Sequence, residues 1–502
     1  MQERYIATVD LGTSKLALCV ARVVGDNVQI IYYKERPSDG IRYNCVFNPK
    51  RAAAPLRAAI GEAEDELQIK ITQVVVGLPR YDVHQETASA SIERSNPESL
   101  ISREEITNLR SFALDTYPLS DGNKELIYGA VTQSFATDDL IGSEDDVDGT
   151  TSDTLAGNFK IFVGGKKSFR NIDIMLGDAG VALAQAIFTP TAVGEAVLKK
   201  DEMTNGVALI EMGAGVTSLS IYQGGIMRYY TAIPFGGKNI TADIRLECAF
   251  DDELAENIKL AFGACLPDKL QNMGDKVLQI NDEENGTYEH LGIKYLSEII
   301  TSRCREIVQA MLFRIQESGF ADRLRCGIVL TGGGANLANL ANLIKEESGY
   351  NVRIGFPLAR KFSSDGCPGI GEAEASASVG MVLEAAVDPT LNCISEVSKA
   401  SEPAPAQGEV KEVAPDDNGQ GNLFDKDDIE TVATKKIVKE PRKQRAPKPP
   451  KPAKDTKEPK ESKPSPLNIF WKKFNSVLEK GFDNTLAELY DGMGSDTNNQ
   501  KQ

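Results

Sequence analysis

A short strand–turn–strand motif, present twice, constrains this chain more than any other feature. The first copy, residues 7–19, runs from an apolar strand through Asp10 into the turn Gly12-Thr13-Ser14, with Lys15 directly behind it. A tight turn of small residues points several backbone N–H groups into one concavity, which suits phosphate oxygens. Lys15 adds a positive charge, and Asp10 is placed to hold a divalent cation through water. Taken alone, this motif is also what a plain β-hairpin looks like.

The second copy, residues 207–222, repeats the order of the first: an apolar strand, the acid Glu211, the turn Gly213-Ala214-Gly215 and an alternating strand. A third turn, Gly332-Gly333-Gly334, follows the apolar strand 326–330 and is expected to open a helix. Two facing cradles and a glycine turn predict a nucleotide cleft between two similar halves. The strands and crossing helices around them predict a two-lobed α/β fold with partly parallel sheets.

Composition argues against several other kinds of site. The two histidines, His84 and His290, are far apart in the sequence, which disfavours a histidine metal site or a catalytic triad. The eight cysteines show no C-x-x-C spacing, so we expect buried thiols in a reducing compartment. We find no signal-peptide pattern and no run long enough to cross a bilayer. Residues 401–502 hold 18 acids and 18 bases, so the net charge of −17 belongs to residues 1–400 and argues against nucleic acid as a partner.

The segment 83–163 has a different sequence pattern from the residues on either side of it. A polar strand at its start, a capping box at Ser102–Glu105 and two further strands predict a small inserted α+β domain. We therefore expect a core made of residues 1–82 and 164–400, with its second lobe at about 200–345, and an insertion at 83–163.

The composition changes after residue 400. Residues 401–466 are rich in Pro, Lys, Glu and Asp, which predicts a disordered linker. Its charge is segregated: residues 401–430 hold nine acids and two bases, whereas residues 435–473 hold fourteen bases and four acids. A flexible spacer is the simplest interpretation of this linker. Residues 491–502 are expected to be a disordered tail.

Residues 467–490 regain a helical period. Apolar side chains share one arc of the helix and lysines lie on the other side; the residues concerned are Phe470, Trp471, Phe474, Val477, Leu478 and Phe482, with Lys472 and Lys473. This pattern favours an amphipathic helix in a membrane interface, with the lysines toward anionic headgroups. Docking in a partner's groove or on the chain's own core are the alternatives.

The three turns, in this order, resemble those of the actin-like ATPase superfamily, whose core is a duplicated RNase H-like fold. Within it, the chain resembles the FtsA family of bacterial cell-division proteins over roughly residues 4–390 and the terminal helix. The most specific segments are the insertion, the helix and the stretches IPFGGKNITADI, IVLTGGGANL and VRIGFPL.

This resemblance implies ATP and Mg²⁺ as ligands. It implies a first phosphate loop at Gly12, Thr13, Ser14 and Lys15 and a second at Gly213, Ala214 and Gly215, with Mg²⁺ near Asp10 and Glu211. It also implies that Gly236 and Gly237 lie on the phosphate side of the nucleotide. Glu256 and Lys259 would bind the ribose or the base, and Gly332, Gly333 and Gly334 would contact the adenosine. The second loop departs from the family pattern at Ala214 and Val216. No carboxylate stands at residues 189–191 to orient a water molecule. We therefore expect ATP binding with slow or negligible hydrolysis.

The resemblance also implies a cellular role. Such a protein would bind the C-terminal tail of the tubulin-like FtsZ and tether FtsZ filaments to the cytoplasmic face of the inner membrane at the division site. It would polymerise as actin-like filaments and recruit later division proteins. The alternatives are a pilus-assembly scaffold of the PilM type, a small-molecule kinase and a heat-shock chaperone of the same superfamily. The absence of a catalytic base candidate disfavours the kinase, and the disordered tail disfavours the chaperone.

Overall fold

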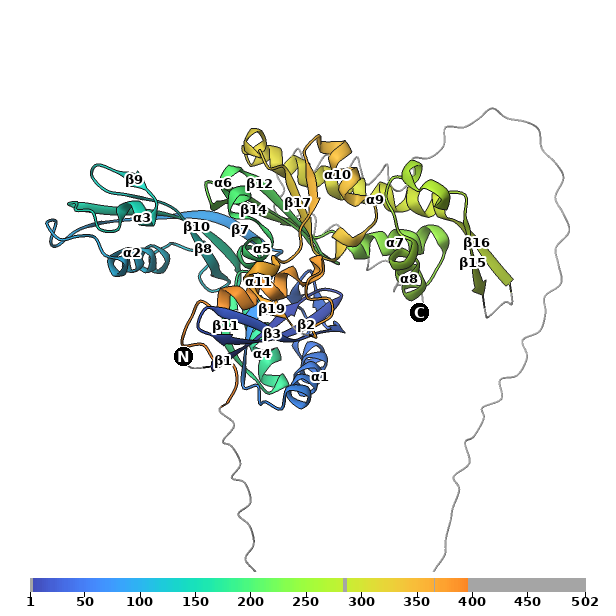
Figure 1. The fold of residues 1–502 in the computed structure, drawn as a ribbon, viewed down its shortest axis with the longest axis horizontal. Coiled ribbons are helices and arrows are strands. Elements are labelled where there is room, and N and C mark those ends of the chain that lie inside the picture. The colour runs from blue at the N-terminus through green and yellow to red at the C-terminus, as the bar shows by residue number, and fades with distance from the viewer. Residues whose placement is uncertain (1–2, 283–286, 365, 396–502) are drawn as a thin grey trace, which may run out of the picture. The chain divides into compact units, whose positions relative to one another are not determined.

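The computed structural model describes residues 3–282, 287–364 and 366–395. The chain divides into two units, Met1–Lys399 and Ala400–Gln502, and all described residues belong to the first. The predicted linker at 401–466, the helix at 467–490 with its membrane-facing residues, and the tail at 491–502 lie outside the described residues. Within the first unit, two mixed sheets form the core and a third, antiparallel sheet is inserted (Figure 1).

The first sheet contains the first copy of the strand–turn–strand motif. Its six strands run in the order β11-β6-β1-β2-β3-β19, with bounds β1 (Glu3–Leu11), β2 (Lys15–Val24), β3 (Asn27–Pro37), β6 (Gln73–Gly77), β11 (Ala182–Ile187) and β19 (Ser363–Ser364). β1, β2 and β3 form an antiparallel meander, and β6, β11 and β19 join in parallel. Most residues of β2 are buried because helices cover both of its faces.

The second sheet repeats this plan. Its order is β14-β13-β12-β17-β18, with bounds β12 (Val207–Met212), β13 (Thr217–Gln223), β14 (Ile226–Ile233), β17 (Ile328–Thr331) and β18 (Val352–Ile354). Again an antiparallel meander of three strands is followed by parallel neighbours. The predicted α/β fold with two similar halves is therefore confirmed, and the two predicted cradles are the β1–β2 and β12–β13 turns.

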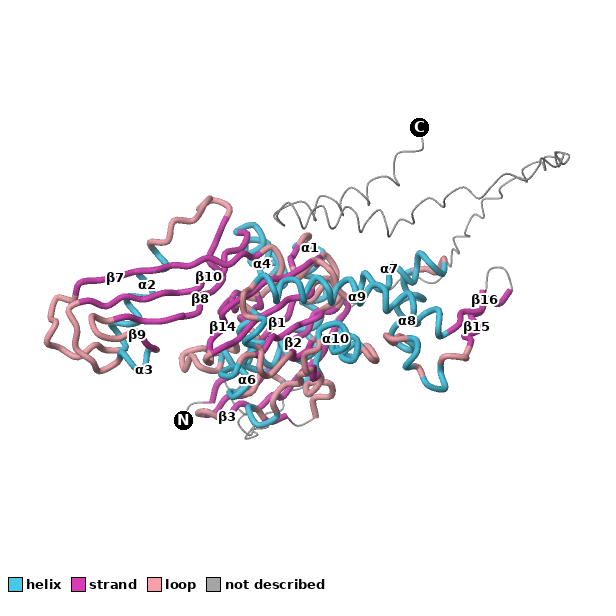
Figure 2. Tube along the Cα trace, turned by 90° about the horizontal axis from the view of Figure 1, so that it is seen from above, coloured by secondary structure: helices cyan, strands magenta, loops and turns pink. Residues whose placement is uncertain are grey.

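A four-stranded antiparallel sheet lies between the core segments in sequence. Its order is β7-β10-β8-β9, with bounds β7 (Val83–Glu93), β8 (Glu125–Ala136), β9 (Ile141–Gly142) and β10 (Thr154–Gly165). The long strands β7, β8 and β10 run side by side (Figure 2). Together with α2 (Arg103–Asp115) they bury a hydrophobic cluster of their own, which includes Phe135 and Phe159. Ser102 caps α2 by accepting a hydrogen bond from the Glu105 N–H.

The helices fill the space around these sheets. Their bounds are α1 (Pro49–Leu67), α3 (Glu144–Val147), α4 (Lys166–Ala179), α5 (Thr189–Val197), α6 (Lys200–Asn205), α7 (Gly237–Cys248), α8 (Asp252–Phe262), α9 (Ile293–Glu317), α10 (Leu340–Ser348) and α11 (Ser376–Ala385). Two hairpins complete the described elements, β4 (Ile41–Arg42) with β5 (Cys45–Val46) and β15 (Val277–Asp282) with β16 (Thr287–Gly292). Within the described ranges, no helix combines the length and apolarity needed to cross a membrane.

One prediction about the third glycine turn was inaccurate. The turn at 332–334 does not open a long helix directly; a short 3-10 helix, Gly333–Asn336, comes first, and α10 begins only at Leu340. Asn339 adopts a left-handed conformation between them, with φ of 63°, which interrupts the helical path.

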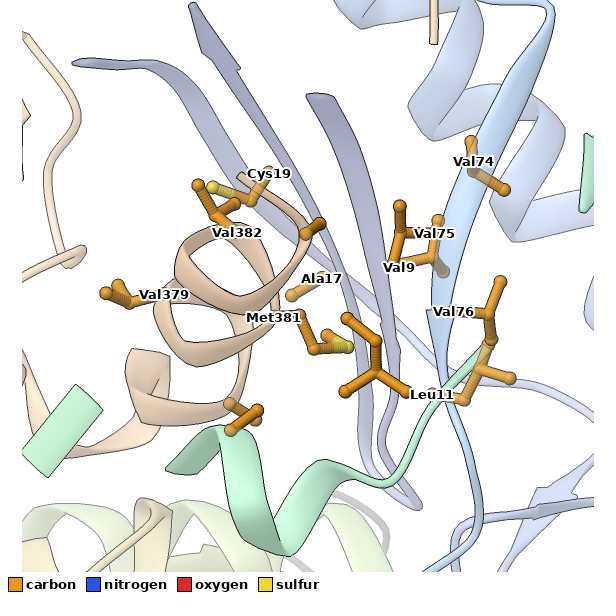
Figure 3. Packing of buried hydrophobic residues seen from close by; sticks show 14 of the residues in the cluster. Val9, Leu11, Ala17, Cys19, Val74, Val75, Val76, Val379, Met381 and Val382 are labelled. Atoms are coloured by element: carbon orange, nitrogen blue, oxygen red, sulfur yellow. The ribbon is translucent and has the colours of Figure 1, made fainter. Parts of the chain in front are cut away.

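Helices α5 and α11 lie side by side between the two core sheets (Figure 1). Met381 and Val382 of α11 point toward Leu11 and Cys19 of the first sheet (Figure 3). The two helices cross very closely, since a Cβ atom on Gly380 would lie 2.3 Å from the carbonyl oxygen of Ala192. Because β11 leads through α5 into the second half, this crossing is where the chain passes between the halves.

A carboxylate sits at this crossing. Thr191 of α5 donates a hydrogen bond of 3.4 Å to Glu384 of α11. Burial raises the pKa of Glu384 to about 7, against which the Thr191 hydrogen bond acts, and the nearby charge of Glu195 adds to the rise.

The replacement Glu384→Gln should stabilise the protein at alkaline pH. Because the pKa of Glu384 is higher in the folded protein than in the unfolded chain, the folded state favours the protonated carboxyl group. The free energy of unfolding therefore falls as the pH rises from below the pKa of Glu384 in the unfolded chain to about 7. At pH 8 the variant should gain about 2 kcal/mol over the parent, with a smaller gain at pH 5.5. Urea unfolding at both pH values measures the difference. Glu372→Gln, at an exposed position, is the control; equal gains at both pH values would contradict the assignment.

Candidate functional site

The two predicted cradles meet face to face. Thr13 in the β1–β2 turn is buried, and a Cβ atom on Gly215 in the β12–β13 turn would lie 2.8 Å from its side chain. Only glycine permits this approach, because any larger residue would push the two turns apart. The two halves of the fold therefore touch at the residues that the sequence motif singled out.

Backbone donors in these turns are left without acceptors. The N–H groups of Thr13, Ser14, Ala214 and Gly215 donate no hydrogen bond to any described residue. Buried backbone N–H groups are nearly always paired in proteins. Thr13 and Gly215 are buried, whereas Ser14 and Ala214 are partly buried. A set of four unpaired donors in two facing turns is suited to receive the oxygen atoms of an anionic ligand.

The segment after β14 contacts the second turn through backbone hydrogen bonds. The Gly236 N–H donates to the Asn239 side chain and the Gly237 N–H donates to the Gly213 carbonyl. These two N–H groups are consequently occupied by protein acceptors. Gly236 and Gly237 therefore brace the second turn and offer no free donor of their own.

Lys238, the next residue, spans the gap between the halves. Its Nζ donates a 3.0 Å hydrogen bond to the carbonyl of Thr13, and its backbone N–H donates to the Ala214 carbonyl. Burial lowers the pKa of Lys238, and the positive charge of Lys259 adds to this effect while Glu256 and Asp252 oppose it. Lys238 thus contacts both turns at once.

The predicted Glu256–Lys259 pair lies beside this lysine on α8. Lys259 Nζ approaches the Glu256 carboxylate at 2.7 Å and also donates to the Gly237 carbonyl at 3.1 Å and to the Thr241 hydroxyl at 2.9 Å. The one-turn spacing predicted from the sequence therefore places both side chains against the start of α7.

The third glycine turn lies over the end of β12. Gly332 has φ of +82°, a region that side chains disfavour, and its N–H donates to the Ala373 carbonyl. A Cβ atom on Gly334 would lie 2.5 Å from the Met212 side chain, and Gly333 lies next to Glu374. Lys15 of the first turn joins the same group, with its Nζ 3.2 Å from Glu374 and 2.7 Å from Glu35.

Burial would lower the pKa of Lys15, but Glu35 and Glu374 outweigh that effect and hold it above its ordinary value. Lys15 therefore carries its charge, but it pairs with two carboxylates that no sequence pattern placed there. It lies at the edge of the first turn, half exposed.

A buried arginine joins the two predicted metal-binding acids. Arg80 Nη2 lies 3.4 Å from Asp10 and 3.2 Å from Glu211, and all three side chains are largely buried. Burial raises the pKa of Glu211, the charge of Asp10 adds to the rise, and Arg80 opposes it. The hydroxyl of Tyr230 donates to the Arg80 carbonyl and holds this segment in place.

These acids do not form a metal site by themselves. Among the described residues, no group of three or more His, Cys, Asp or Glu side chains is arranged to hold a metal ion. Arg80 supplies the positive charge between the two carboxylates instead. Mg²⁺ that is bound together with a nucleotide usually has phosphate oxygens and water as most of its ligands and few protein ligands. Asp10 and Glu211 fit a Mg²⁺ ion that is bound in this way.

Three residues of this site were missed by the sequence analysis: Arg80, Lys238 and Glu374. Lys238 carried a readable signal, because a lysine directly after Gly236-Gly237 and at the start of a helix is a common phosphate-binding arrangement. Arg80 and Glu374 gave none. Each lies far in sequence from the residues that it contacts, so only the folded chain brings them there.

The first turn of α5 contains no acidic residue. Glu384 on α11 accepts a hydrogen bond from Thr191. The charge of Glu195 raises its pKa, whereas the charges of Asp10 and Glu211 do not contribute. Glu384 thus belongs to the helix crossing described above.

Removing the charge of Arg80 should be strongly destabilising. Arg80→Gln leaves two carboxylates buried without a counter-charge, which costs about 3–5 kcal/mol of unfolding free energy. Adding Glu211→Gln to that variant should restore part of the loss, since one like charge is removed. Chemical denaturation of the single and double variants measures this. An additive double variant would show that the two residues do not interact.

Comparisons with known proteins agree on one family. Residues 208–380 match the family model "Cell division protein FtsA". The Cell division protein FtsA of Borreliella burgdorferi is 29% identical over 403 residues, covering 79% of this chain and 95% of the relative. That of Neisseria meningitidis serogroup B is 28% identical over 359 residues, covering 71% and 84%. That of Bacillus subtilis is 25% identical over 364 residues, covering 71% and 79%.

A solved structure supports the fold. A chain of the PilM-PilN type IV pilus biogenesis complex superposes with a TM-score of 0.52 at 17% identity, covering 77% of this chain and 99% of that one. This likeness concerns the fold alone. The duplicated sheets, the facing turns and the relatives at 25–29% identity over most of their length agree on one likeness: the chain is similar to the FtsA family of cell division proteins.

Proposed function

We propose that the chain binds ATP, with Mg²⁺, between the two facing turns. The observation that carries this proposal is the set of four unpaired N–H donors at Thr13, Ser14, Ala214 and Gly215. Lys238 adds a positive charge between the turns, and the positive end of the α7 dipole begins at Gly237. Glu256, Lys259 and the third turn would border the nucleoside.

Mg²⁺ would contribute charge neutralisation of the phosphates. This chain's own residues would bind and orient: the turns through their N–H groups, Lys238 and Lys15 through their charge. The first turn of α5 offers no carboxylate to orient an attacking water, so hydrolysis is slow or negligible. A turnover of about 10 s⁻¹, typical of a dedicated enzyme, would contradict this.

The replacement Gly215→Ala should weaken ATP binding. The new methyl group would meet Thr13 at 2.8 Å and separate the turns, which costs about 1–3 kcal/mol and corresponds to roughly a tenfold to hundredfold loss of affinity. Titration calorimetry of the full chain with ATP and Mg²⁺ measures it. Gly177→Ala, on α4 with nothing within 4 Å of the added atom, is the matched control. If all three proteins bind alike, the nucleotide lies elsewhere; if the parent does not bind, the proposal fails.

We further propose that the protein polymerises in an actin-like manner, binds the C-terminal tail of FtsZ, tethers FtsZ filaments to the cytoplasmic face of the inner membrane at the division site and recruits later division proteins. Similarity to the FtsA cell division proteins supports this role. The amphipathic pattern of residues 467–490 supports membrane contact. A single such helix is a weak anchor, and polymerisation would strengthen it by multiplying the contacts. We also propose the domain limits expected from the sequence: a core of residues 1–82 and 164–400, an insertion at 83–163, a linker at 401–466, the helix at 467–490 and a tail at 491–502.

Flotation with vesicles tests the tether. Full-length protein with ATP should carry FtsZ to the top of a gradient with anionic vesicles, whereas a chain ending at Ser465 should not. Trp471→Glu should abolish flotation because it places a charge on the apolar arc, and Ser476→Glu, which adds the same charge to the polar side, should not. Flotation of the protein without FtsZ would favour a PilM-type scaffold. No flotation at all would mean that the helix serves a protein partner.

A further inference from the structure

A basic cavity lies away from the facing turns, where the inserted sheet meets the second core sheet. It has a volume of ≈ 540 Å³. β8 and β10 form one wall, and the β13–β14 turn with residues 320–323 forms another. Three of its lining side chains are cations, Lys160, Arg228 and Arg323, and none of the described residues that line it is acidic. Such a concentration of positive charge is unexpected in a chain with a net charge of −17.

Two β-bulges aim side chains at this cavity. In the inserted sheet, Asn158 pairs with Ser134 and Phe159 with Thr132, so Gln133 is left as an extra residue. In the second core sheet, Ile221 pairs with Tyr229 and Tyr222 with Met227, so Arg228 is the extra residue. Bulges redirect side chains and are frequent beside binding sites.

The two bulged residues contact one another across the junction. Arg228 Nη1 donates to the Gln133 side-chain oxygen at 3.1 Å, and Gln133 donates in turn to the Met227 carbonyl at 3.0 Å. Arg228 Nε donates to the Gln223 carbonyl, which fixes the plane of the guanidinium group. One bulge on each sheet thus positions the central cation of the cavity.

No acidic side chain among the described residues that line the cavity compensates its positive charge. Lys160 Nζ and Arg228 Nη2 have no hydrogen-bond or ion-pair partner among the residues that the structure describes. Burial lowers the pKa of Lys160, and the charge of Arg228 lowers it further. Burial also lowers the pKa of Arg228. Charged groups that are partly buried without a counter-ion are costly, so the fold maintains this arrangement at the expense of stability.

We propose that this cavity is a binding site for a small ligand that carries a phosphoryl group. The planar guanidinium of Arg228 suits bidentate contact with oxyanions, and its Nη2 and the Lys160 ammonium supply free donors. Three cations match the two or more charges of a phosphoryl ligand better than the single charge of a carboxylate. The inference does not depend on the nucleotide cleft, because none of the residues that form the facing turns lines this cavity.

A ligand held here would contact both sheets at once. Lys160 belongs to the inserted sheet and Arg228 to the second core sheet, so a shared anion would join them and remove their mutual repulsion. Binding would therefore fasten the insertion to the core, and reduce exchange of backbone amides in β8 and β14.

The test uses the full-length protein and pyrophosphate as the probe. Calorimetric titration of the parent is compared with Lys160→Gln and with the control Lys167→Gln, which removes the same charge from an exposed position on α4. Lys160 has no partner among the described residues and is repelled by Arg228, so Lys160→Gln should be at least as stable as the parent without pyrophosphate. Pyrophosphate at the nucleotide cleft would affect all three proteins equally, so the Lys160-dependent part reports this cavity.

We expect Lys160→Gln to bind pyrophosphate at this site at least about tenfold more weakly, as the loss of one charge-assisted hydrogen bond implies, with Lys167→Gln unchanged. Amide exchange in residues 125–136 and 226–233 should slow with pyrophosphate in the parent and not in Lys160→Gln. Equal titrations and equal exchange in all three proteins would overturn the site. Malonate, a dicarboxylate, is the comparison ligand. If malonate binds in a Lys160-dependent manner and pyrophosphate does not, the phosphoryl assignment is wrong.

Discussion

The architecture depends on one buried guanidinium. In each half of the fold an acid is the next-to-last residue of the first motif strand, Asp10 in β1 and Glu211 in β12. The duplicated geometry brings these two carboxylates toward each other. Without a counter-charge they would repel across a buried interface. Arg80, which follows β6, lies within 3.4 Å of both. Its single charge makes the close approach of the two glycine turns possible.

Other contacts between the halves follow from that approach. Once the turns meet at Thr13 and Gly215, Lys238 can reach from the second half to the Thr13 carbonyl. Glu374, next to the third turn, can pair with Lys15 from the first. The close crossing of α5 and α11 at Gly380 supports these contacts from the side where the chain passes between the halves. The free N–H donors thus sit in a frame that charged and close-packed contacts hold from several directions.

The inserted sheet is joined to the core by a different means. Its contact with the second half combines polar groups at two bulges, Gln133 and Arg228, with an edge-on aromatic contact between Phe162 of β10 and Tyr230 of β14. A junction of this kind is open to adjustment, because a bound anion would change its energy while leaving the core of each sheet intact. We thus propose one anion site between the similar halves and another at the base of the insertion.

The sequence by itself determined the local elements and their repetition. Apolar strands ending in Asp10 and Glu211, with glycine turns after them, were readable because strand periodicity and turn chemistry act over a few residues. The confirmed two-half α/β fold followed from those repeats. What the tertiary structure decided was which distant residues complete the sites: Arg80 between the acids, Glu374 beside Lys15, and Arg228 opposite Gln133. A charge on an isolated residue has no periodic signal, and its role is fixed only when the packed sheets bring its partner within a few ångströms.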